Sequence, residues 1–245
     1  MYNNKMNKVN VVILYSGFKK HGATATLATY IENGIKKSNS LSNVTKYNVN
    51  YIRKHHIPHI INNVKNCNVL IMGTGTYNGN VEDELLEFIN TNFKAGKDPN
   101  AINLQNVACG QFATAAYYGT GAQPVLNSLS RLMMTFGGNI ISGPSWRISQ
   151  GVIGIVDNPD KSNPKKWEWN KDFSPYLEEN AESYGKRLLN MGLLFQNLRE
   201  NYSMINTGLS TTSDNGNTVA IISVIITGIV VLALIAFAIY LWNKK

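Results

Sequence analysis

The chain has 245 residues, a formal net charge of +8, 44% hydrophobic residues and 16% charged residues. This length suits one substantial domain or two small ones, and the ordinary hydrophobic share excludes an intrinsically disordered protein. Two cysteines, with no secretory signal in the polar start of the chain, exclude a disulfide-stapled scaffold and predict free thiols in a reducing compartment.

Strand-like and helix-like segments alternate from residue 9 to residue 201. Short apolar, β-branched runs predict strands buried on both faces, whereas apolar residues at helical spacing predict the helices between them. Strand-like segments are expected at 9–15, 45–51, 69–73, 107–110, 140–142 and 152–156, and helices at 24–37, 57–67, 81–92, 122–136 and 174–199. This alternation predicts an α/β fold with a doubly wound, parallel, five-stranded sheet and helices on both faces.

The C-terminal part differs in composition from the rest. After the domain at 9–201, residues 202–218 are weakly hydrophobic and predict a flexible linker, and residues 219–242 are 24 consecutive uncharged residues. As a helix they would reach roughly 36 Å, enough to cross a bilayer once. We expect a single-pass C-terminal transmembrane helix with a short basic tail at 243–245. The domain would then face the cytosol, on a cellular, organelle or viral membrane.

Positive charge is concentrated in the first 66 residues, which begin with a polar N-terminal tail at 1–8. Residues 1–66 carry ten lysines and arginines and a single acid, Glu32. A basic face of this kind favours anionic partners such as phosphorylated ligands or lipid head groups, or it is a solvated surface with no partner. Basic and aromatic residues are not interleaved, so we expect no nucleic-acid partner.

Three loops that follow predicted strands carry candidate ligand-binding residues. In a doubly wound sheet, ligands bind beyond the carboxyl ends of the strands. The loop at 16–25 leads into a helix, whose open N–H groups and dipole favour a phosphate, although it matches neither the Walker A nor the GxGxxG pattern. The loops at 74–80 and 110–121 combine glycines with aromatic rings and suit a planar ligand. The alternative for each loop is an ordinary connection between a strand and a helix that binds no ligand.

These loops resemble those of flavodoxin-like proteins, most of all the FMN-dependent NAD(P)H:quinone oxidoreductases of the tryptophan-repressor-binding-protein type. The resembling segments read YSGFKKHGATATLATYIENGI, GTGTYNGNVEDELLEFI and GQFATAAYYGTGAQPVLNSLSRLMMTFGGNII. The resemblance implies that the FMN phosphate binds at Ser16, His21, Gly22, Ala23 and Thr24. It places the flavin ring at Thr76, Tyr77, Asn78, Gly79 and Asn80, with Gly110, Gln111, Tyr118 and Gly119 on the other side.

The resemblance also implies an activity and its partners. Electrons would pass from NAD(P)H through FMN to a quinone or a similar acceptor, with no catalytic side chain and no metal, because the flavin carries the chemistry. The family is commonly oligomeric, so a homo-oligomer is expected, and a membrane anchor suits a lipid-soluble acceptor.

Three departures from the family pattern support a second hypothesis. The first loop has about three extra residues near 17–19, Gly75 replaces the usual proline, and 135–137 lack a histidine that is common there. The alternative is therefore a flavodoxin-like domain that has lost FMN and acts as a membrane-anchored structural or interaction protein.

Overall fold

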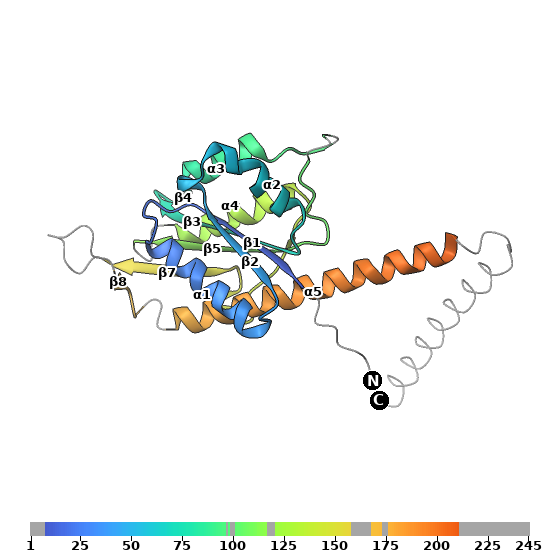
Figure 1. The fold of residues 1–245 in the computed structure, drawn as a ribbon. Coiled ribbons are helices and arrows are strands. Elements are labelled where there is room, and N and C mark those ends of the chain that lie inside the picture. The colour runs from blue at the N-terminus through green and yellow to red at the C-terminus, as the bar shows by residue number, and fades with distance from the viewer. Residues whose placement is uncertain are drawn as a thin grey trace, which may run out of the picture. The chain divides into compact units, whose positions relative to one another are not determined.

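The computed structural model describes residues 8–96, 98, 101–116, 121–157, 168–172 and 176–210. The chain divides into two compact units, Met1–Gln196 and Asn197–Lys245. The first unit contains a sheet with helices around it (Figure 1). The described part of the second unit is the end of the C-terminal helix.

Strands and helices alternate along the first unit, as the hydrophobic pattern predicts. The strands are β1 (Asn10–Tyr15), β2 (Asn43–Asn48), β3 (Val69–Tyr77), β4 (Asn80–Val81), β5 (Ala108–Ala115), β6 (Asn139–Ile140), β7 (Val152–Asp157) and β8 (Glu168–Trp169). The helices are α1 (Ala23–Ser38), α2 (Ile57–Lys65), α3 (Asp83–Asn92), α4 (Ala122–Thr135) and α5 (Leu177–Ser210). Short 3-10 turns lie at η1 (Val49–Tyr51), η2 (Lys54–His56) and η3 (Trp146–Ile148).

The long strands form the predicted five-stranded parallel sheet, in the order β2-β1-β3-β5-β7. Val11 of β1 pairs with Val69 of β3, and Val69 is in turn in register with Ala108 of β5. Three two-residue strands extend this sheet: β6 runs parallel to β5, whereas β4 and β8 run antiparallel to β3 and β7. The predicted α/β fold class is therefore confirmed.

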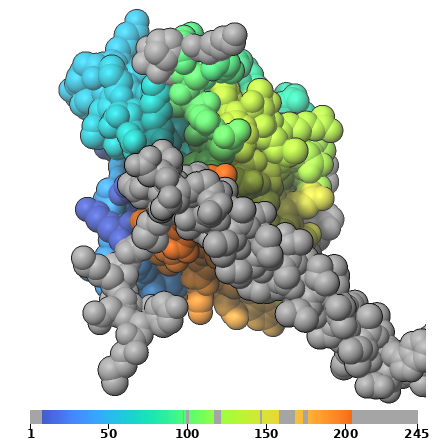
Figure 2. Space-filling view, turned by 90° about the vertical axis from the view of Figure 1, so that its right-hand side faces the viewer, coloured from blue at the N-terminus to red at the C-terminus, as the bar shows by residue number. Residues whose placement is uncertain are grey.

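Helices cover both faces of the sheet, as predicted. Helices α1 and α5 lie on one face, and α2, α3 and α4 lie on the other (Figure 1). Figure 2, which looks at the end where the strands begin, shows the same division, with α2 and α4 above and α5 below. Alternate residues of β1 supply the two cores: Val12 and Leu14 face α2, α3 and α4, whereas Val11 and Ile13 face α1 and α5.

Strand β5 is longer than the sequence pattern predicts, since it continues five residues beyond the expected end at 110. All eight of its residues are buried. At its middle, where β6 has ended and β7 has not yet begun, the hydroxyl of Tyr184 fills the gap in the sheet. It donates to the carbonyl oxygen of Ile141 at 3.0 Å and accepts from the backbone N–H of Gln111 at 3.2 Å. Burial raises the pKa of Tyr184, so this hydroxyl keeps its proton.

The C-terminal helix is also longer than predicted. It continues to Ser210, so the first half of the expected flexible linker at 202–218 is helical. Extending an existing helix needs no new nucleus, and no proline interrupts this stretch, which accounts for the difference. No helix within the described residues is long and apolar enough to cross a bilayer. The predicted transmembrane helix at 219–242 and the tail at 243–245 lie outside them.

Candidate functional site

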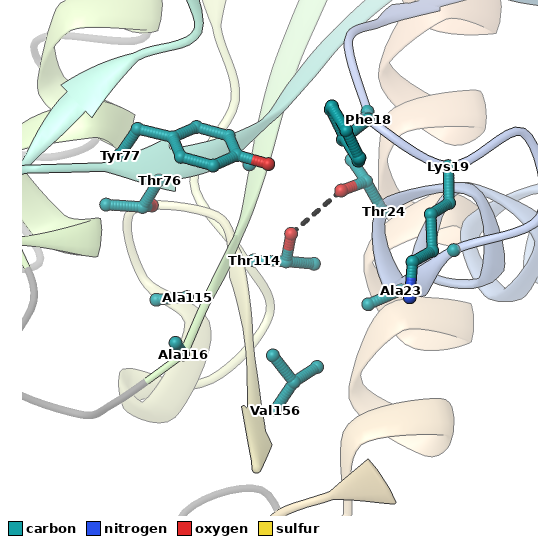
Figure 3. A pocket seen from close by; sticks show the side chains of 13 residues that line it. Phe18, Lys19, Ala23, Thr24, Thr76, Tyr77, Thr114, Ala115, Ala116 and Val156 are labelled. Atoms are coloured by element: carbon teal, nitrogen blue, oxygen red, sulfur yellow. Dashed lines mark hydrogen bonds between the residues drawn. The ribbon is translucent and has the colours of Figure 1, made fainter. Parts of the chain in front are cut away.

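A cavity of about 240 Å³ lies at the carboxyl ends of the central strands, beside the start of α1. We call it the α1 cavity (Figure 3). Its lining comes from the β1–α1 loop and from the ends of β3, β5 and β7: Gly17, Phe18, Lys19, Gly22, Ala23, Thr24, Gly75, Thr76, Tyr77, Thr114, Ala115, Ala116 and Val156. This is the edge of the sheet at which a doubly wound fold binds ligands.

The N-terminus of α1 opens into the α1 cavity and is suited to an anion. Gly22 is the N-cap, and as a glycine it offers no side chain that could bond to the open N–H groups of the first turn. That turn contains no acid, so nothing there neutralises the positive end of the helix dipole. Free N–H groups and the dipole together make this a natural phosphate site.

Two threonines join α1 to β5 at the floor of the α1 cavity. The hydroxyls of Thr24 and Thr114 lie 2.8 Å apart and are hydrogen-bonded (Figure 3). The hydroxyl of Thr76, which also lines the cavity, is buried and has no hydrogen-bond partner among the residues that the structure describes. A buried hydroxyl without a partner is costly, and a polar ligand would satisfy it.

The second predicted loop is a β-hairpin. Strands β3 and β4 are joined by Asn78 and Gly79, both with positive φ, as in the type I′ turn that Asn-Gly favours. The ring of Tyr77 covers Gly75 and leaves half of its own surface exposed at the cavity. On the far side of the turn, a Cβ atom on Gly121 would lie 2.8 Å from the Cα of Gly79. The hairpin and the start of α4 are therefore in close contact.

A layer of hydrogen bonds supports the hairpin from below. The buried hydroxyls of Ser16 and Thr74 lie 2.9 Å apart, and the Thr74 hydroxyl accepts from the backbone N–H of Glu82 at 3.1 Å. Oε1 of Glu82 accepts from the side-chain amide of Asn50 at 3.4 Å. Oε2 is buried without a partner among the described residues. One carboxylate oxygen close to the site is thus left unsatisfied.

The pKa of Glu82 is raised, because burial disfavours the charged carboxylate. The Ser16 hydroxyl and the Asn50 amide oppose this effect, whereas the neighbouring carboxylates of Glu84 and Asp83 add to it. Burial also raises the pKa of the Tyr77 hydroxyl, with the charges of Glu82 and Glu84 adding to the shift. The hydroxyl therefore remains a neutral hydrogen-bond donor.

Replacing Glu82 with glutamine should stabilise the chain at neutral pH. Since the folded-state pKa lies above the unfolded-state value, the stability that Glu82 contributes is greatest below the unfolded-state pKa and is lost as pH rises through the folded-state pKa. Glu82→Gln removes this loss, because glutamine stays neutral and never places a charge in the buried position. We expect a gain of about 1 kcal/mol, the order of magnitude for the desolvation of a poorly paired buried group. Thermal unfolding of both proteins between pH 4 and pH 8 measures it.

The difference in melting temperature should widen as pH rises. Glu87→Gln, an exposed change on α3, the helix that begins directly after Glu82, is the control and should leave the pH profile of the wild-type chain unchanged. Parallel pH profiles for the wild-type chain and Glu82→Gln would contradict the assignment.

The structure brings together five of the predicted site residues and separates the others. Gly22, Ala23, Thr24, Thr76 and Tyr77 line the α1 cavity. Asn78 and Asn80 line an adjoining cavity of about 330 Å³, which shares Phe18 and Tyr77 with the first. The remaining predicted residues that the structure describes occupy other places: Gly79 in the turn, Ser16 buried beneath the loop, and His21 at a different cavity.

The positions expected for Gly110 and Gln111 were wrong. Both are buried in the middle of β5, since the strand continues to Ala115 before the third loop begins. A Cβ atom on Gly110 would meet the side chain of Leu188, and the side-chain amide of Gln111 donates to the carbonyl oxygen of Gln150. Tyr118 and Gly119 lie outside the described residues.

Sequence reasoning missed several residues of the α1 cavity. Thr114, Ala115 and Ala116 lie within the third candidate loop at 110–121, but they were not among the residues assigned to the ligand there. Val156 is the second-to-last residue of β7, the last of the long parallel strands. The rule that ligands bind beyond the carboxyl ends of the strands could therefore have predicted it. Phe18 had no signal: it is three-quarters exposed at the cavity, where a loop would be expected to carry polar residues.

The cysteines and histidines lie elsewhere. Cys67 and Cys109 are free and buried, and burial raises the pKa of the Cys109 thiol to about 12, which keeps it protonated. His55 and His56 contact each other ring to ring at the surface. Within the described ranges, no group of three or more metal-ligating side chains could hold a metal ion.

Comparison with solved structures identifies the architecture. A flavodoxin, a WrbA-like protein from Agrobacterium tumefaciens, matches with a TM-score of 0.54 at 16% identity, over 77% of this chain and 99% of that one. The fold is flavodoxin-like. An oxidoreductase from Corynebacterium diphtheriae matches with a TM-score of 0.55 at 12% identity, over 76% of this chain and 98% of that one.

A third flavodoxin-like match is RosB. Its structure contains 8-demethyl-8-formylriboflavin-5'-phosphate, and it matches with a TM-score of 0.55 at 10% identity, over 84% of this chain and 89% of that one. No protein-family model matches the chain, and no curated protein sequence matches it. At these identities the likeness establishes the fold alone.

Proposed function

We propose that this chain is an FMN-binding oxidoreductase that takes electrons from NAD(P)H and passes them to a quinone or a similar acceptor. The observation that carries the proposal is the α1 cavity, where an uncapped helix N-terminus and the ring of Tyr77 meet at the carboxyl ends of a flavodoxin-like sheet. Two of the matching solved structures are described as an oxidoreductase and as a protein with a bound flavin phosphate.

The residues of the α1 cavity fit a flavin phosphate. The N–H groups at the start of α1 and the hydroxyl of Thr24 are donors for phosphate oxygens, and the side chain of Lys19 adds a positive charge. The unpartnered hydroxyl of Thr76 is available to a polar atom of the ligand. Nothing in the lining is acidic among the described residues, so no charge there repels a phosphate.

The protein contributes binding and orientation to this chemistry. FMN, when bound, supplies the hydride and electron chemistry itself. Tyr77 offers an aromatic face beside the ligand, and its hydroxyl stays protonated as a donor. The hairpin turn, fixed by Asn78 and Gly79 and packed against Gly121, holds that ring in place.

The proposal also includes an electron acceptor, a membrane anchor and an oligomeric state. A single-pass membrane helix at 219–242, with the domain on the cytosolic side, would keep the α1 cavity near a lipid-soluble quinone. A homo-oligomer would be assembled from domains anchored in the same bilayer. The segment's 24 uncharged residues support the anchor.

The test is to purify the full-length chain in a mild detergent and record its visible absorbance after removal of free FMN. We expect flavin bands in a one-to-one ratio with protein, and oxidation of NADH or NADPH when a quinone is added. A folded chain that neither retains FMN nor is stabilised by it would refute the proposal. It would favour the alternative of a membrane-anchored interaction protein. The exposed ring of Phe18 at the cavity would then be a contact for the partner protein.

A further inference from the structure

A larger hollow of about 670 Å³ lies across the edge strand of the sheet. Strand β2 is the last strand on its side, and the hollow runs over it between the β1–α1 loop and the η2–α2 segment. We call it the β2 groove, and the residues used in the argument are Lys20, His21, Tyr47, Tyr51, His56 and His59. Its volume lies within the range of roughly 300–1,000 Å³ that is usual for small-molecule sites.

The β2 groove is basic and has no opposing acid. Lys20 and His21 enter it from the β1–α1 loop, and His56 and His59 enter it from the other side of β2. No acidic side chain lines it among the residues that the structure describes. A groove with this lining attracts an anion.

The nearby carboxylate of Glu32 does not cancel this charge. Its two oxygens bind Lys36 at 2.6 Å and Lys46 at 2.5 Å. Lys46 also donates to the hydroxyl of Thr29 at 2.8 Å, so it is a fixed part of the wall. With two lysines on one carboxylate, this cluster is itself net positive, and Lys20 is additional to it.

Two tyrosine rings in the β2 groove are held by their hydroxyl groups. The hydroxyl of Tyr51 donates to the carbonyl oxygen of Phe18 at 2.8 Å, and the hydroxyl of Tyr47 accepts from the side-chain amide of Asn63 at 2.6 Å. Rings that are fixed at one end lose little freedom when a ligand packs on them. A planar aromatic group stacks well on tyrosine.

One loop separates the β2 groove from the α1 cavity. Lys19 and Gly22 face the α1 cavity, whereas Lys20 and His21 face the β2 groove. The loop is tied to the end of β2 and to the turn that follows it. Asn48 donates to the Gly17 carbonyl oxygen at 3.2 Å, and Gly17 N–H donates to the side-chain oxygen of Asn50 at 3.1 Å. The two hollows therefore have separate polar groups, and two ligands would not share them.

We propose that the β2 groove is a second ligand site, which binds a nucleotide. The phosphate groups lie at Lys20 and His21, and the base packs on Tyr51 and Tyr47. Cations alone would suit any anion, and rings alone would suit any flat apolar molecule. A nucleotide carries both chemistries within the length of one groove. The site is independent of the proposed FMN site.

The test uses three probes on the full-length chain in mild detergent, with affinities measured by calorimetry. ADP carries both groups, pyrophosphate lacks the base, and adenosine lacks the phosphates. We expect ADP to bind at least tenfold more tightly than either fragment. Lys20→Ala combined with His21→Ala should weaken ADP and pyrophosphate at least tenfold, and Tyr51→Leu should weaken ADP and adenosine but not pyrophosphate.

The matched control is Lys186→Ala, which removes an exposed lysine from α5 and should change no affinity. FMN at saturating concentration should not displace ADP. The proposal is overturned if ADP fails to bind at millimolar concentration, if pyrophosphate binds as tightly as ADP, or if the double variant keeps the wild-type affinity. Displacement of ADP by FMN would overturn it too, by placing the nucleotide in the α1 cavity.

Discussion

Replacing Ala23 with glutamate should lower the affinity for FMN about 100-fold while leaving the chain folded. Ala23 is the first residue of α1 and lines the α1 cavity. A carboxylate there favours the helix, because it complements the positive end of the dipole, but it opposes a phosphate in the same space. Two like charges about 4 Å apart near a protein surface repel by a few kcal/mol, and a 100-fold loss corresponds to about 2.7 kcal/mol.

Quenching of FMN fluorescence measures this affinity, and the melting temperature shows whether the fold persists. Asn33→Glu is the matched control, since it adds the same charge to the same helix, ten residues or about 15 Å further along the axis. That distance exceeds a Debye length of about 10 Å at 0.1 M salt, so FMN binding should be unchanged. Equal losses of FMN affinity in both variants would assign the effect to net charge. Undiminished binding by Ala23→Glu would show that the phosphate does not bind at this end of α1.

Replacing Gly185 with alanine should destabilise the first unit by about 3 kcal/mol. Gly185 lies where α5 crosses α1, and a Cβ atom there would lie 2.2 Å from the carbonyl oxygen of Ile31. Across the same contact, a Cβ atom on Gly34 would lie 1.9 Å from the carbonyl oxygen of Glu182. Because these neighbours are backbone atoms, the helices must move apart, and overpacking of this kind costs about 1–3 kcal/mol, occasionally more.

Urea unfolding of the full-length chain in mild detergent measures this change. Alanine favours a helix by about 1 kcal/mol over glycine, so a net loss can come only from the crossing. Asn190→Ala, an exposed change on α5, is the control and should alter the free energy of unfolding by no more than about 0.5 kcal/mol. If Gly185→Ala were as stable as this control, the close crossing would be wrong.

Local patterns predicted most of the sheet and its helices. The β-branched run of β1 and the helical spacing of Leu27, Ile31 and Ile35 are properties of neighbouring residues, and the structure places these three side chains in one core. The end of β5 was predicted wrongly because its residues, ACGQFATA, are small and mixed in polarity. The strand continues because Phe112 fills the space above Gly73, a contact between different strands.

The site was predicted less completely than the fold. The sequence pointed to the start of α1 and to Tyr77, since a strand–helix loop and a Gly-rich turn are local signals. It did not predict that His21 and Thr24, which are three positions apart in the sequence, would line different cavities. The β1–α1 loop places His21 in the β2 groove and Thr24 in the α1 cavity.

The sequence by itself determined the order of the elements, the α/β class and the loops at the carboxyl edge, because periodicity and turn chemistry act over a few residues. Only the tertiary structure decided which side chains meet. The hydroxyls of Thr24 and Thr114 are 90 residues apart in sequence, and those of Ser16 and Thr74 are 58 apart. Such pairs depend on how the elements pack, because Thr24 lies in α1 and Ser16 follows β1, whereas Thr74 and Thr114 lie in the neighbouring strands β3 and β5. In those strands a shift of one residue would turn each side chain to the other face of the sheet.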